Sequence, residues 1–134
     1  MAEEILKFTK LTFIIHFVIS LIFTILFFLP DITVPLFGIP FNIYTQAMCL
    51  TIASLFAGFM VSSFCSVFAK EWKQVKIVVI FEVVWLVANL ITMIISFIVL
   101  DVLMATLTLI ITIVLLVLFI LTLLQQEDKM KALF

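Results

Sequence analysis

Long apolar stretches separated by short polar segments divide this chain, and inside each stretch the few polar residues recur at helical spacing. The run 75–100 shows this most clearly. On a helix that turns roughly 100° per residue, its less apolar residues fall within an arc of about 80°. These residues are Glu82, Trp85, Asn89, Thr92 and Ser96. In water such a helix would be inside out, so the pattern predicts a membrane helix whose polar stripe faces other helices.

The same pattern predicts four transmembrane spans, at 8–29, 43–69, 75–99 and 103–124. The apolar run that begins at Val75 is too long for one span, because some fifty residues would make a helix about 75 Å long in a hydrocarbon core of about 30 Å. Asp101 is the charge that interrupts this run, and a carboxylate there is suited to cap the start of the fourth helix.

Three segments connect or follow the spans. Residues 30–42 contain all three prolines and are predicted to form a non-helical outer link. Residues 70–74 are predicted as a cytoplasmic link, and residues 125–134 as a cytoplasmic polar tail. Hydrophobic residues make up 67% of the chain and charged residues 11%, against roughly half and a quarter in soluble proteins. Residues 1–134 are therefore expected to form a single all-α transmembrane domain.

The lysines indicate how the bundle is oriented. All seven lie at the start of the first span, around the link between the second and third spans, or in the tail, and the other two links have none. This asymmetry predicts an antiparallel four-helix bundle in the cell membrane with both termini cytoplasmic. The net charge of −1 and the absence of arginine argue against nucleic acid as a partner.

The second span carries a face of small residues in a three-and-four repeat, which in lipid lets two helix backbones approach closely. The face consists of Ala47, Thr51, Ser54, Gly58, Ser62 and Cys65. It predicts packing against another helix, of this chain or of another. Cys49 and Cys65 are sixteen residues apart on one helix, about 24 Å along its axis, so no disulfide is expected between them.

Glu82 is the first candidate for chemistry, because it lies about 9 Å into its helix, where a bare carboxylate is costly. It could bind a proton or cation in a transport path, or be hydrogen-bonded within the bundle. His16 and Ser62 are predicted at a similar depth, and a His16–Glu82 pair would titrate as a unit. Trp85, Asn89 and Ser96 could extend an ion or ligand path, or simply pack and bond between helices.

Other chemistry is not expected. One histidine and one glutamate make a poor metal site, and two glycines in all exclude glycine-rich motifs. No cofactor and no catalytic residues are predicted. An intramembrane enzyme would need His16 and Cys65 to meet, and the chain is expected not to be an enzyme.

The layout of four spans with a longer first outer link is similar to that of tetraspan membrane proteins. The favoured interpretation is a small protein that acts by helix packing, as a subunit, assembly factor or scaffold. Its partners would be the lipid bilayer, further copies of itself or other membrane proteins. The alternative is a small oligomeric transporter or channel that uses the polar stripe centred on Glu82.

Overall fold

The computed structural model describes residues 4–131, and these residues form four long helices and one short helix. The long helices are α1 (Lys7–Phe27), α3 (Ile43–Val67), α4 (Trp72–Ser96) and α5 (Val102–Lys131). Each is long and apolar enough to cross a membrane. The short helix is α2 (Pro30–Leu36). The predicted class, an all-α protein with four transmembrane helices, is confirmed.

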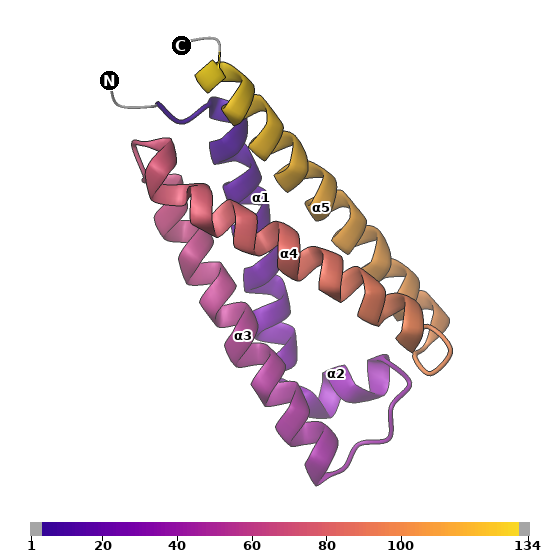
Figure 1. Ribbon diagram of the computed structural model, residues 1–134. Helices are drawn as coiled ribbons and strands as arrows, with labels where there is room; N and C mark the ends of the chain where they lie inside the picture. Colours follow the sequence, from indigo (N-terminus) through magenta and orange to yellow (C-terminus); the bar gives the residue numbers. More distant parts are fainter. Residues whose placement is uncertain (1–3, 132–134) are drawn as a thin grey trace.

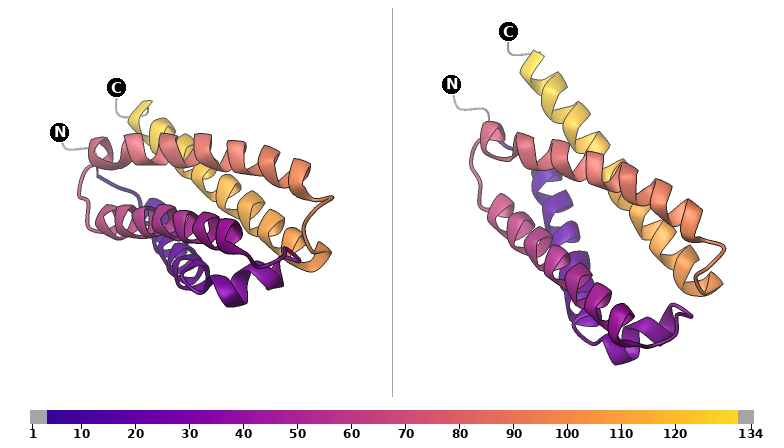
Figure 2. Two further views of the ribbon diagram at one scale, coloured as in Figure 1. Left: turned by 90° about the horizontal axis from the view of Figure 1, so that it is seen from below. Right: turned by 60° about the horizontal axis from the view of Figure 1, so that its bottom comes forward.

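The four long helices form two pairs. α1 packs along α3, α4 packs along α5, and a smaller contact between α1 and α5 joins the pairs. α3 and α4 meet at the link between them and then diverge, so they contact each other little (Figures 1 and 2). The bundle is therefore closed between α1 and α5 and parted between α3 and α4.

Both termini and the α3–α4 link lie at the same end of the bundle (Figure 1). The lysines follow the chain to this end, because they flank the start of α1, the start of α4 and the end of α5. We call it the lysine end. The opposite end carries α2 and the α4–α5 turn.

The lysine end is closed by the last turns of α5. The buried Gln126 side chain accepts hydrogen bonds from the Leu6 N–H at 3.1 Å and from Thr9 Oγ1 at 3.3 Å, and it donates to the Glu4 carbonyl at 3.0 Å. Glu4 also pairs with Glu71 as an isolated antiparallel bridge. The predicted tail is thus helical as far as Lys131 and packs on the segment before α1. The sequence could not show this, because the groups that Gln126 contacts, on Glu4, Leu6 and Thr9, are more than a hundred residues away along the chain.

The opposite end differs from the prediction in one respect. Residues 30–42 were expected to be non-helical, but Pro30–Leu36 forms α2. Proline is well suited to the first turn of a helix, where its missing N–H leaves no bond unmade. The Thr33 hydroxyl also donates to the Leu26 carbonyl, which holds α2 against the end of α1.

The turn between α4 and α5 confirms the predicted cap. Asp101 Oδ1 accepts from the N–H groups of Leu103 at 3.1 Å and Met104 at 3.2 Å. The Asp101 N–H donates to the Phe37 carbonyl at 2.9 Å, which ties this turn to the end of α2. The helix α4 begins at Trp72, three residues before the predicted start. This start is capped by Gln74 Oε1, which accepts from the N–H groups of Lys70 and Glu71.

The apolar core lies in the lysine-end half, between α1, α4 and α5. Its largest members are Phe13, Trp72, Leu86 and Phe119. Many other large apolar side chains point away from the bundle, for example Ile77, Ile95 and Ile98, which are 78%, 70% and 94% exposed. Such a surface is suited to lipid and not to water.

Candidate functional site

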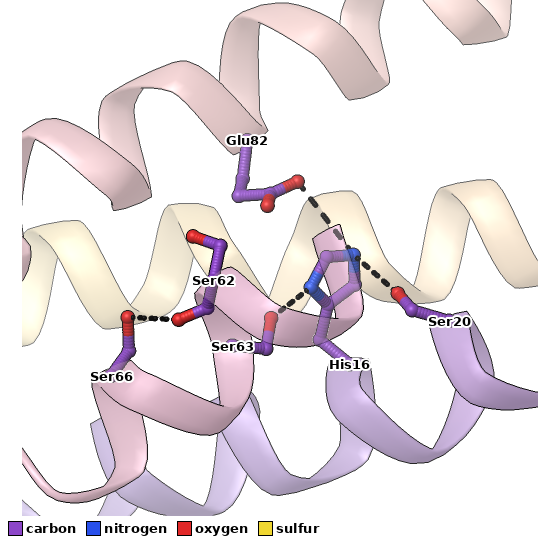
Figure 3. A network of polar contacts seen from close by, with 6 residues as sticks. All are labelled: His16, Ser20, Ser62, Ser63, Ser66 and Glu82. Carbon is purple, nitrogen blue, oxygen red and sulfur yellow. Dashed lines mark hydrogen bonds and ion pairs between the residues drawn. The ribbon is translucent and has the colours of Figure 1, made fainter. Parts of the chain in front are cut away.

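A buried polar layer centred on His16 joins three of the helices (Figure 3). His16 Nδ1 lies 2.6 Å from Ser63 Oγ of α3, and His16 Nε2 lies 3.5 Å from Ser20 Oγ of α1. His16 Nε2 also lies 3.6 Å from Glu82 Oε2 of α4. All four side chains are buried. The layer joins two residues that the sequence placed at one depth, His16 and Glu82.

Glu82 is the least satisfied polar residue of this layer. It is 1% exposed, and neither carboxyl oxygen has a hydrogen-bond partner among residues 4–131. Its one ionisable neighbour in the described chain is His16. A buried carboxyl group without donors is costly in a low-dielectric interior, so this position is the natural candidate for binding a proton or a cationic group.

The third partner in the layer is Ser63 and not Ser62. The Ser62 carbonyl accepts from Ser66 Oγ at 2.8 Å, while the neighbouring Ser63 side chain turns to the histidine (Figure 3). One residue corresponds to a rotation of about 100° around a helix, and α3 carries small residues on both faces. The regular spacing of Cys49, Ala53 and Ser63 was the available signal for the buried face.

Aromatic rings surround the layer. The His16 ring packs against Phe119, with centroids 5.2 Å apart, and against Phe59 at 6.2 Å. Trp85 of α4 contacts Phe59 at 4.6 Å and Phe56 at 6.0 Å. These rings exclude water from the layer on its α3 side and form an apolar wall beyond it.

The other polar residues of α4, Asn89, Thr92 and Ser96, make different kinds of hydrogen bond. Asn89 Nδ2 donates to Thr112 Oγ1 of α5 at 3.0 Å, which binds the two helices together. Thr92 is exposed and its hydroxyl donates to the Ala88 carbonyl of its own helix. Ser96 ends α4, and its carbonyl accepts from Val99 and Leu100 in the turn. The structure therefore brings Glu82 to His16, binds Asn89 to α5, and leaves Ser96 at the far end of the helix.

A cavity of about 380 Å³ opens where α3 and α4 diverge. Its wall is mostly apolar and aromatic, with contributions from all five helices. A recess of about 30 Å³ adjoins it and shares Phe23, Phe56, Trp85, Asn89 and Thr108 with it. The recess also touches His16 and Ser20. The polar layer and the cavity are thus neighbouring parts of one site.

Most of the small-residue face of α3 is open in the described chain, and only its part nearest the lysine end, Ser62 and Cys65, shares a groove with the start of α4. Ala47, Thr51, Ser54, Gly58 and Cys65 are exposed, and Ser62 is half-buried. A Cβ added at Gly58 would meet nothing within 4 Å. The side of α3 that packs on α1 is the opposite one, with Cys49, Ala53 and Ser63.

The two cysteines are both free, as the sequence predicted. Cys49 is buried and its thiol points to the Phe27 carbonyl at 3.4 Å. Cys65 lies on the exposed face of α3, whereas His16 contacts Ser63 on the buried face. In the described residues the histidine is therefore engaged with hydroxyl groups and a carboxyl group instead of a thiol.

Fold and site together define a class, a small integral membrane protein of four helices with a buried His–Glu pair beside a cavity. Comparison with protein-family models, with curated proteins and with solved structures returned no match. The function is therefore inferred from the chain's own residues.

Proposed function

We propose that this protein acts by packing against a partner in the membrane, as a subunit, assembly factor or scaffold of a membrane complex. The observation that carries the proposal is the exposed small-residue face of α3. The two hydroxyls nearest its middle are already bonded to their own helix, Thr51 Oγ1 to the Ala47 carbonyl at 2.9 Å and Ser54 Oγ to the Thr51 carbonyl at 2.7 Å. The face is therefore ready for dry, close helix contact.

The proposal places the protein in the cell membrane with both termini in the cytoplasm. Its support is the gathering of the lysine-bearing segments at one end of the bundle. The partner is a second copy or another membrane protein, and it would bring a helix alongside α3.

A bulky side chain in the middle of the face tests this. The variant Gly58→Leu should abolish co-purification of the partner in mild detergent, because the two backbones could no longer approach closely. The matched control is Ala88→Leu, which places the same side chain at a small, exposed position on α4. A Ser54→Cys variant in a Cys65→Ser background, oxidised in native membranes, distinguishes the two candidate partners, since a disulfide-linked dimer identifies a second copy. A monomer in mild detergent that retains no partner would refute the packing role.

A second function, transport, is favoured by one observation: the carboxyl group of Glu82 is buried in a span and lies 3.6 Å from a histidine. Such a pair can hold and release a proton within the bilayer. Flux into liposomes should then be measured for the wild type and for Glu82→Gln against a panel of cations. Transport by this pair requires a flux in the wild type that falls in the variant, and equal fluxes or none at all would exclude it.

A further inference from the structure

We propose that the cavity between α3 and α4 binds a lipophilic amine taken from the membrane. The apolar body of the amine would lie against the aromatic wall, with its ammonium group at the recess lined by His16, the residue that contacts Glu82. This assignment goes beyond the packing role and concerns a different face of α3.

Access to the cavity is from the side. Met48 and Leu55 line it from α3 and are 65% and 45% exposed, and Thr92 lines it from α4 and is also exposed. All three belong to helices able to span a membrane, so the opening between them faces hydrocarbon. A molecule that enters here must first dissolve in the bilayer.

The two ends of the cavity are closed. At the α2 end Thr33 and Val34 are buried and line it, and the hydrogen bond from Asp101 to Phe37 ties α2 to the α4–α5 turn. Toward the lysine end the Trp85–Phe59 contact at 4.6 Å closes it. A volume of about 380 Å³ falls within the range of small-molecule sites, roughly 300–1,000 Å³. The space therefore fits one compact amphiphile.

The recess supplies the polar end of the site. It is lined by His16 and Ser20 from α1, Asn89 from α4, and Thr108 and Thr112 from α5. The remaining cavity wall is largely apolar. An occupant therefore needs a single polar group at one end of an apolar body.

Charge selects an amine among such molecules. Glu82 lines neither the cavity nor the recess, but its Oε2 lies 3.6 Å from Nε2 of His16, which lines the recess, and both Glu82 oxygens lack a donor within residues 4–131. The nearest lysine along α4, Lys76, is already bound to Glu127 at 2.7 Å. An ammonium group in the recess would be attracted by an ionised Glu82 across the His16 ring, and the faces of Trp85 and Phe56 suit a cation. The carboxylate of a fatty acid would be repelled by the same charge.

Tryptophan fluorescence reports on this site directly, because Trp85 lines it and the chain has one other tryptophan, Trp72. The Trp72→Phe variant is reconstituted in phosphatidylcholine nanodiscs and titrated with dodecylamine, dodecanol and dodecanoic acid, each brominated at the chain end. Quenching of Trp85 should saturate, with the amine effective at about tenfold lower mole fraction in the lipid than the alcohol or the acid. The converse variant, Trp85→Phe, should lose the saturable signal.

Three variants locate the site. Glu82→Gln keeps the shape of the side chain and should weaken amine binding about tenfold while leaving alcohol binding unchanged. Thr108→Phe should block all three ligands, because Thr108 lines both the cavity and the recess. Its neighbour Leu107 is 49% exposed on the outer surface, so Leu107→Phe should bind like the parent protein. Helicity and elution volume confirm that each variant is folded.

The comparison of the three ligands on the parent protein stands even if a variant does not fold. Alcohol and amine binding equally well would overturn the choice of an amine, and so would a Glu82→Gln variant that keeps full amine affinity. Quenching that never saturates would show ordinary partitioning into lipid and would refute the site.

Discussion

Polar residues in the spans fall into two groups according to how their hydrogen bonds are met. Several threonines return their hydroxyls to their own backbone: Thr24 donates to the Ser20 carbonyl at 2.7 Å, and Thr108 to the Met104 carbonyl at 2.8 Å. Such a residue costs little in lipid and requires no partner. Glu82 cannot do this, and among the described residues it has only the His16 ring nearby. At the scale of single residues, Glu82 is therefore, among those described, the buried polar side chain whose hydrogen bonds are least met.

Asp101 yields a prediction at the same scale. Replacing it by alanine removes the acceptor for the Leu103 and Met104 N–H groups and should reduce the free energy of unfolding by about 1 kcal/mol. Asp101→Asn keeps a capping oxygen and should lose much less. Steric-trapping or detergent-unfolding measurements in bicelles give the two values. A loss equal in both variants would show that the charge, and not the cap, matters.

At the scale of elements, the packing within pairs of helices is extensive and the contact between α3 and α4 is slight. The Trp85–Phe59 contact joins the parted helices partway along, with ring centroids 4.6 Å apart, and at the end opposite the lysines the α2 loop meets the α4–α5 turn. The cavity lies between these two contacts and depends on them for its shape.

The two glycines make a matched pair for testing the α2 contact. Gly38 has φ of +72°, and a Cβ there would lie 3.3 Å from the Asp101 Cβ and backbone nitrogen. Gly38→Ala should therefore destabilise the protein by about 1–2 kcal/mol, through left-handed strain and crowding. Gly58→Ala should not destabilise the isolated chain, because its Cβ has open space and alanine is the better helix former. Equal stabilities of the two variants would mean that the contact between Gly38 and Asp101 does not stabilise the protein.

At the scale of the whole molecule, charge and connectivity agree. An even number of apolar helices returns the chain to the end where it began, and the lysine-bearing segments lie there. The contacts of Gln126 and Lys129 with the Glu4 carbonyl join the two ends of the described chain.

Reporter fusions test the orientation in cells. A reporter that is active only in the cytoplasm should be active when fused to either terminus, because positively charged segments are retained there. The same reporter inserted after Ile39, in the link that follows α2, should be inactive. Activity at one terminus alone would indicate an odd number of crossings, and activity only after Ile39 would invert the bundle.

The sequence by itself determined the class of protein and the number of long apolar helices. Lipid requires long apolar helices, and local composition is enough to recognise them. The capping carboxylate of Asp101 marks where the last two of them divide. It also placed Glu82 and His16 at one depth, because depth follows from counting residues along a helix.

Only the tertiary structure decided which face of each helix turns inward. The choice of Ser63 over Ser62, the exposure of the face around Gly58 and the packing of Gln126 on the first residues all depend on helix rotation and on partners distant in sequence. Small residues stand on both sides of α3, so periodicity is satisfied either way. The short helix α2 was hidden for a similar reason, since its prolines signal an end of helix unless the first of them occupies the first turn.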